Sequence, residues 1–171
     1  MATRVGAADL HPEDRKAELP QEGLPGRAAA RIYRSLDNYE RAVGGGLAFP
    51  GTFVFVVDMP HRRSFSPDAA FWSGKLPSGV PFLIGAPLFA VEVRSENDYG
   101  TEAEQALARE RADYFAAGAL VVWDVDVLRA QEIRVYRASH PDLPEVFWRG
   151  EWADAKPALP NWSFLVDDLL P

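Results

Sequence analysis

The sequence contains no cysteine among its 171 residues. This absence excludes a disulfide framework, a thiolate metal site and a cysteine nucleophile, and it fits a reducing cytoplasm. The sequence also lacks an apolar run long enough to span a membrane, and residues 1–19 lack the apolar core of a signal peptide. We therefore expect a cytoplasmic protein without disulfides.

Several catalytic motifs are missing as well. The three histidines, His11, His61 and His140, are scattered and form no HExxH motif, so a zinc protease is unsupported. No Gly-x-Ser-x-Gly nucleophile elbow occurs. The glycine triplet at residues 44–46 lacks the Gly-Lys-Ser/Thr ending of a phosphate-binding loop, and we interpret it as a helix terminator and linker.

A basic excess is also absent, since 18 Lys and Arg residues face 25 Asp and Glu residues, for a net charge of −7. Strong nonspecific binding of nucleic acid normally depends on a basic surface, so the overall charge argues against it. A local basic groove remains compatible with this composition.

The sequence is rich enough in apolar residues, at 47%, to build a substantial core. A turn signal, Leu24-Pro25-Gly26, separates a polar start from the rest. We expect a flexible N-terminal arm over residues 1–23 and a single domain over residues 24–171.

Hydrophobic periodicity predicts two helices and several strands. One helix is expected over residues 27–43, and a second begins at the capping box Thr101–Glu104 and runs to about Ala117, before Gly118. Strands are expected at residues 52–58, 65–72, 82–84, 88–95, 120–127 and 132–137, and a short apolar end at 164–170. The order strand, helix, strand over residues 88–127 predicts a parallel βαβ crossover and an α/β fold with a mixed central sheet.

The residue that most needs an explanation is Glu92, in the apolar strand 88–95. A carboxylate there is costly to bury unless it is paired or binds a metal. Asp68 lies on another predicted strand, and Arg94 shares the face of Glu92 because side chains alternate along a strand. Two carboxylates at adjacent strand ends can hold a hard cation such as Mg²⁺, which activates water and neutralises phosphoryl charge. Arg94 could stabilise the same charge.

Structural roles are the alternative for these residues. Asp68 follows a proline and could simply be a turn residue or the start of a strand. Glu92, Arg94 and Glu110 could form a structural ion-pair cluster. Residues 96–98 favour a solvated turn over a metal-binding loop, because the spacing of a calcium loop is absent.

A family resemblance adds to this pattern. Pro67-Asp68 followed by Glu92-Val93-Arg94 is similar to the PD-(D/E)XK nuclease motif, with arginine at the lysine position. Residues 91–100, 112–118 and 122–126 resemble the bacterial Uma-two family of restriction-endonuclease-like proteins. The resemblance implies a restriction-endonuclease-like fold and a DNA endonuclease that hydrolyses phosphodiester bonds with Mg²⁺, or with Mn²⁺ in its place. It also implies Asp68 and Glu92 as metal ligands and DNA as the partner; a homodimer is compatible with it.

One position departs from the family pattern. Members commonly carry a lysine four residues before the tyrosine of the Tyr-x-x-x-Gly segment; that tyrosine is Tyr114, so Glu110 stands at the lysine position. Glu110 would be a further metal ligand or the partner of Arg94, and catalysis would be weakened. The alternative is a catalytically inactive PD-(D/E)XK-like interaction or regulatory module. In either case we expect Asp68, Glu92 and Glu110 to converge, with the residues His61, Arg62 and Arg63 adding phosphate contacts.

Overall fold

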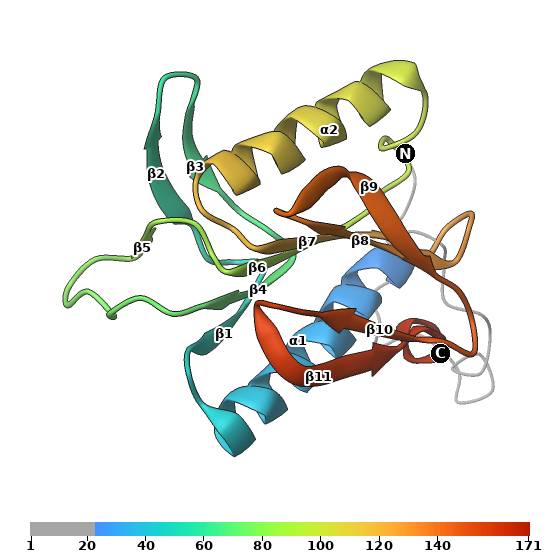
Figure 1. The fold of residues 1–171 in the computed structure, drawn as a ribbon, viewed down its shortest axis with the longest axis horizontal. Helices are drawn as coiled ribbons and strands as arrows, with labels where there is room; N and C mark the ends of the chain where they lie inside the picture. Colours follow the sequence, from blue (N-terminus) through green and yellow to red (C-terminus); the bar gives the residue numbers. More distant parts are fainter. Residues whose placement is uncertain (1–22) are drawn as a thin grey trace, which may run out of the picture.

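The computed structural model describes residues 23–171, and a mixed six-stranded sheet lies at its centre (Figure 1). The arm expected over residues 1–23 lies, apart from Gly23, outside the described residues. The strand order is β1-β4-β6-β7-β8-β9, and β6 and β7 are parallel while the other neighbours are antiparallel. The strands are β1 (Leu47–Pro50), β4 (Ala69–Trp72), β6 (Phe89–Val93), β7 (Val121–Asp126), β8 (Glu132–Arg137) and β9 (His140–Phe147).

Two helices cover opposite faces of this sheet (Figure 1). Alternation along β6 sends Phe89 and Val91 toward α1 (Leu24–Val43), and Ala90 toward α2 (Thr101–Ala116). The helix α2 connects β6 to the parallel strand β7, which confirms the expected βαβ crossover and the mixed α/β fold. No helix in the described part of the chain is long and apolar enough to cross a membrane.

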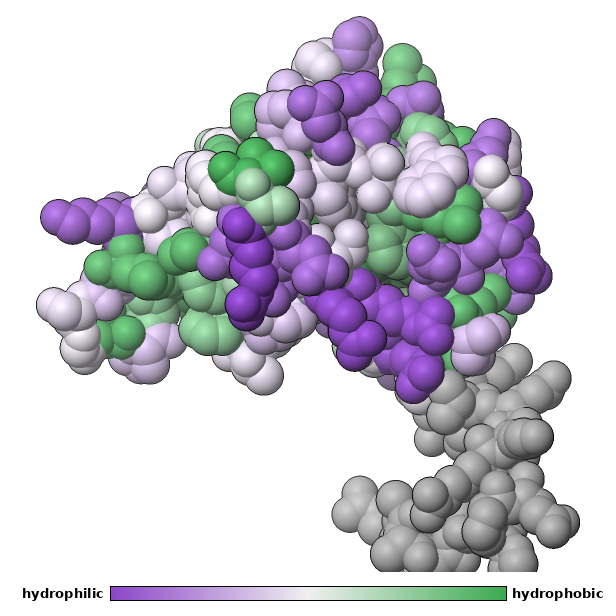
Figure 2. Space-filling model, turned by 90° about the horizontal axis from the view of Figure 1, so that it is seen from below, coloured by the Kyte–Doolittle hydropathy of each residue, from purple (hydrophilic) through white to green (hydrophobic). Residues whose placement is uncertain are grey.

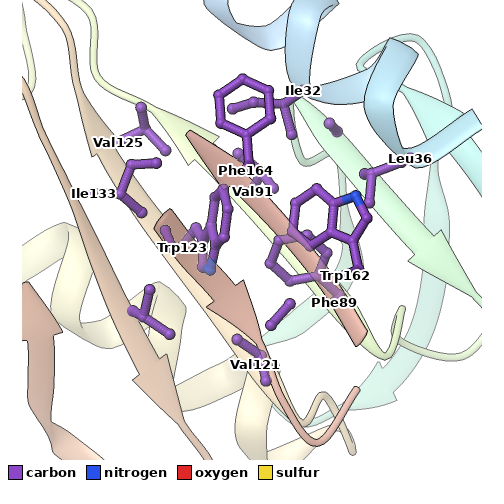
Figure 3. Packing of buried hydrophobic residues seen from close by; sticks show 14 of the residues in the cluster. Ile32, Leu36, Phe89, Val91, Val121, Trp123, Val125, Ile133, Trp162 and Phe164 are labelled. Carbon is purple, nitrogen blue, oxygen red and sulfur yellow. The ribbon is translucent and has the colours of Figure 1, made fainter. Parts of the chain in front are cut away.

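The core on the α1 side is built around Trp123, which is fully buried (Figure 3). Its ring packs edge-on against Phe89 and tilts against Trp162, and its indole N–H donates to the carbonyl of Asp154 at 3.0 Å. Phe89 belongs to β6, whereas Asp154 and Trp162 come from the C-terminal strands β10 (Trp152–Ala155) and β11 (Leu159–Leu165), which the helix η3 (Val166–Leu169) follows. Of these C-terminal elements the sequence predicted only an apolar end.

The face that carries α2 also holds a small sheet in the order β3-β2-β5, made of β2 (Phe55–Met59), β3 (Arg62–Phe65) and β5 (Leu83–Ile84). The strand expected over residues 65–72 is therefore wrong as one piece. It is divided between β3 and β4, and the break contains Pro67, which has no N–H for a ladder hydrogen bond. The break leaves Asp68 directly before β4.

Both helix starts differ from the prediction. The helix α1 begins at Leu24, because Pro25 is tolerated in a first helical turn, so the expected turn signal is part of the helix. The helix α2 has Gly100 as its N-cap and no side-chain cap bond, so the predicted capping box does not form. The Glu104 carboxylate instead binds Arg94. At the other end, α2 stops at Ala116 and Gly118 has a φ of +110°, as expected.

Candidate active site

The local backbone places Asp68 against the strand that carries Glu92. The Asp68 N–H donates to the carbonyl of Val91 at 2.9 Å, and Asp68 Oδ2 accepts the N–H of Val93 at 2.7 Å. Asp68 is therefore anchored to β6 on both sides of Glu92. Because β4 and β6 are antiparallel, the start of β4 lies beside the end of β6.

Glu92 is held from the other side by α2. The hydroxyl of Tyr114 donates to Glu92 Oε1 at 2.6 Å, and the fully buried tyrosine ring stacks on Phe65 of β3 at 4.0 Å between centroids. Burial raises the pKa of Glu92 well above its usual range, and the negative charge of Glu110 adds to the rise, while the Tyr114 hydrogen bond opposes it. Sequence analysis identified Tyr114 as the tyrosine of the Tyr-x-x-x-Gly segment but did not assign it this role.

Glu110 reaches the same region from α2. Burial raises the pKa of Glu110, and the charges of Asp113 and Asp68 raise it further, whereas Arg62 lowers it. The nearest opposite charge is Arg62, whose Nη1 lies 3.6 Å from Glu110 Oε1. The charges of Asp68 and Glu110 both raise the pKa of Glu92, so the three residues lie in one region, and their convergence in a single site stays a prediction. We call these three residues the acidic cluster.

Asp98 is a further negative charge that sequence analysis assigned to a solvated turn. Its carboxylate accepts both the N–H and the hydroxyl of Ser95, so it does stabilise that turn. It nevertheless adds to the raised pKa of Asp68, of which burial is the largest cause, and to that of Glu92. The acidic cluster thus lies in a strongly negative region, in which a cation would relieve mutual repulsion.

The donor set fits a cation held largely by water and substrate. Among residues 23–171, no three or more His, Asp or Glu side chains are grouped so that they could hold a metal ion. In the same residues, no hydrogen bond involves Asp68 Oδ1 or Glu92 Oε2, so each residue retains one carboxylate oxygen for a ligand. Mg²⁺ typically binds through one or two carboxylates and keeps several waters, which matches this pair.

Arg94 occupies a different environment from the one that sequence analysis expected. Its side chain is buried, at 4% exposure, between Asp124 of β7 and Glu104 of α2. Nε and Nη2 donate to the Asp124 carboxylate at 2.7 Å each, Nη1 and Nη2 donate to Glu104, and Nη1 also reaches the carbonyl of Asp98 at 3.3 Å. These five bonds use all five N–H donors of the guanidinium, so none is left for a phosphate.

The structural ion-pair cluster also differs from the expected one. In the described chain, no salt bridge joins Arg94 to Glu92 or Glu110; the arginine pairs with Asp124 and Glu104 instead. Asp124 is the register partner of Glu92 on β7, which explains why Arg94 and Glu92 share a face without being paired. A pairing across parallel strands leaves no local signal in the sequence.

The basic turn between β2 and β3 is largely neutralised. Asp113 of α2 accepts His61 Nε2 and Arg62 Nε, each at 2.7 Å, and Arg63 pairs with Asp58 at 2.8 Å. The pKa of Asp113 is lowered, because its bonds to Arg62 and His61 outweigh the effect of burial. Asp113 was not singled out from the sequence, although its position three residues after Glu110 placed it on a neighbouring part of the same helix surface.

Comparisons with known proteins identify the family and the fold of the chain. The model of the Uma2 family, described as "Putative restriction endonuclease", matches residues 16–167. The fold is similar to the crystal structure of "a putative nuclease belonging to DUF820" from Anabaena variabilis, with a TM-score of 0.69 and 16% identity over 89% of this chain and 83% of that one. No curated protein matches the sequence. The resemblance inferred from the sequence is thus confirmed, and the chain belongs to the Uma2 family.

Proposed function

We propose that the protein is a nuclease that hydrolyses DNA phosphodiester bonds with a divalent cation, Mg²⁺ or Mn²⁺, held by Asp68 and Glu92. The observation that carries the proposal is the anchoring of Asp68 on both sides of Glu92. It gives two neighbouring carboxylates, each with one oxygen outside the hydrogen bonds of residues 23–171. Membership of the Uma2 family supports the same reaction class.

A divalent cation bound there would supply an activated water and would neutralise charge on the phosphoryl group. The protein holds the two carboxylates in position. Asp68 is fixed by the backbone of β6, and Tyr114 orients Glu92 through its hydroxyl. Because burial raises the pKa of both carboxyl groups, cation binding competes with protons and should strengthen as the pH rises.

The environments of Glu110 and Arg94 indicate that cleavage is slow. Glu110 places a negative charge in the region where a phosphate would lie, and Arg62, the cation beside it, is already bonded to Asp113. Arg94 has no unused donor. Electrostatic stabilisation of the transferring phosphoryl group is therefore weaker than a lysine at position 110 would make it.

The same two features favour a second candidate function, which is a module that binds its partner without cleaving it. The two functions differ in one measurable property. A nuclease converts supercoiled plasmid to nicked or linear DNA when Mg²⁺ or Mn²⁺ is present, and the binding module does not.

The test is a plasmid cleavage assay at high enzyme concentration with Mn²⁺, and separately with Mg²⁺. We expect slow nicking by the unmodified protein and none by Glu92→Gln, which keeps an acceptor for Tyr114 but loses the charge. Equal nicking by both proteins would reveal a contaminating nuclease and would overturn the assignment. Absence of nicking in both, with metal binding intact, would select the binding module.

A further inference from the structure

A groove lies on the opposite side of the central sheet from the acidic cluster. The part of α1 from Arg27 to Asn38 forms one wall, and β10, β11 and η3 form the other. Its volume is about 420 Å³, which lies within the range of small-ligand sites. Figure 2 views the molecule from below, where these elements lie in Figure 1, and shows strongly hydrophilic residues gathered on this side.

Three arginines line the groove. Arg27, Arg31 and Arg34 are spaced by four and three residues along α1, so they lie on one side of the helix. Within residues 23–171, no carboxylate forms a salt bridge with any of them. By contrast, carboxylates neutralise eight arginines elsewhere: Arg41, Arg62, Arg63, Arg94, Arg111, Arg134, Arg137 and Arg149. Among the residues that the structure describes, the groove is therefore a local concentration of positive charge that no carboxylate pairs with, in a chain of net charge −7.

The rest of the lining is suited to a nucleotide. Arg31 is fixed by its Nη1, which donates to the carbonyls of Asp168 and Leu170 at 2.9 and 2.7 Å, so its remaining donors are already oriented. Trp152 forms part of the wall with 59% of its surface exposed. Ser163 and Asn38 add polar groups, and Asp168 is the one acidic residue that residues 23–171 contribute to the lining.

We propose that this groove binds single-stranded nucleic acid, with phosphates against Arg27 and Arg34 and a base stacked on Trp152. A positively charged groove combined with an exposed aromatic ring is the usual basis of single-strand binding without sequence preference. The basic turn at β2–β3 is a poorer anion site, because Asp113 and Asp58 already neutralise it. The proposal does not depend on cleavage, since the acidic cluster lies on the other face of the sheet.

The test measures binding of a fluorescein-labelled oligothymidylate by fluorescence anisotropy in EDTA, so that cleavage cannot contribute. The double variant Arg27→Gln/Arg34→Gln should lose about tenfold in affinity, and the slope of log K against log salt should fall by about 1.4 for two lost phosphate contacts. Trp152→Leu should lose about fivefold or more, because stacking is removed. The matched control Lys75→Gln/Arg109→Gln removes the same charge from exposed positions outside the groove, and it should bind like the unmodified protein.

Three results would overturn the proposal. Equal losses in the groove variant and the control would show a general charge effect. Full affinity in both the groove variant and Trp152→Leu would place the strand elsewhere. Displacement of the oligonucleotide by inorganic phosphate or thymidine monophosphate at the same concentration as by unlabelled oligonucleotide would assign the groove to a small anion. Should the double variant fail to fold, Arg34→Gln alone, at an exposed position, should lose about threefold.

Discussion

At the scale of single residues, Glu92 contributes to the pH dependence of stability in the metal-free protein. Burial raises the pKa of Glu92 well above the reference value of 4.5, so the folded chain holds this proton more tightly than the unfolded chain. The corresponding stabilisation is fully present below the unfolded pKa and is lost as the pH rises through the folded pKa.

Glu92→Gln should therefore raise the melting temperature at pH 8 in EDTA, because the glutamine resembles the protonated acid. The difference from the unmodified protein should shrink toward acid pH. Thermal unfolding followed by circular dichroism across this range provides the measurement. A variant that is less stable than the unmodified protein at pH 8 would show that Glu92 is better accommodated as an anion.

Tyr114 is the residue that positions Glu92. Tyr114→Phe keeps the ring stacked on Phe65 but removes the hydroxyl that donates to Glu92. Loss of this hydrogen bond raises the pKa of Glu92 further, because the bond opposes the rise at present. Mn²⁺ binding should weaken, and its pH midpoint should move to higher pH.

The readout is the pH profile of metal affinity, which a purely structural role for Tyr114 would leave unshifted. The free energy of unfolding should fall by about 1 kcal/mol, as for an ordinary hydrogen bond. An unchanged pH midpoint would separate Tyr114 from the metal site.

Glu110 gives the sharpest prediction for activity. Glu110→Lys replaces a negative by a positive charge next to Asp68 and Glu92, and it should increase metal-dependent DNA cleavage. Arg62, which now faces Glu110, would be repelled but keeps its bond to Asp113. The control Glu110→Lys/Glu92→Gln should return cleavage to background. Robust cleavage by the unmodified protein, with no gain in Glu110→Lys, would show that cleavage does not need a positive charge at position 110.

At the scale of elements, Arg94 joins β6, β7 and α2. Removing one partner of a buried ion pair leaves an uncompensated charge, which typically costs about 3–5 kcal/mol. Arg94→Met should therefore reduce the free energy of unfolding by about that amount, although Arg111, 3.9 Å from Asp124, compensates part of the charge. Urea denaturation measures the loss. Arg63→Met, at an exposed pair, should change stability by less than about 1 kcal/mol, and a similar loss in both variants would contradict the account.

The elements also show which local signals were sufficient. Alternation placed Glu92 and the neighbouring apolar side chains on opposite faces of β6, and the spacing of Glu110 and Tyr114 oriented α2 correctly. The capping box did not form, because Gly100 and not Thr101 is the N-cap, and Glu104 forms a salt bridge with Arg94. Which carboxylate pairs with Arg94 depends on the register between β6 and β7. Arg94 and Asp124 are far apart in the sequence, so no local pattern reveals that they pair.

At the scale of the whole molecule, sequence analysis predicted the sheet centre better than its coverings. The run from β6 through β7 was recognised because its two buried strands and the helix between them each have a clear pattern of hydrophobic residues. The β10–β11 pair was missed because β10 has only four residues, Pro157 follows it, and Pro160 lies within β11. The pair packs against the core around Trp123. Strand and helix spacing placed Asp68 and Glu110 near enough to Glu92 for their charges to raise its pKa, and a shared site for the three stays a prediction. The environment of Arg94 required three-dimensional information.

The central claim is that Asp68 and Glu92 together hold a divalent cation, and calorimetric titration with Mn²⁺ tests it most directly. The account predicts binding of roughly one ion per chain, stronger at pH 8 than at pH 6, and its loss in both Asp68→Asn and Glu92→Gln. Asparagine keeps an acceptor for the Val93 N–H, so the fold at this point is preserved. Absence of binding at millimolar Mn²⁺, or binding that both variants retain, would contradict the claim.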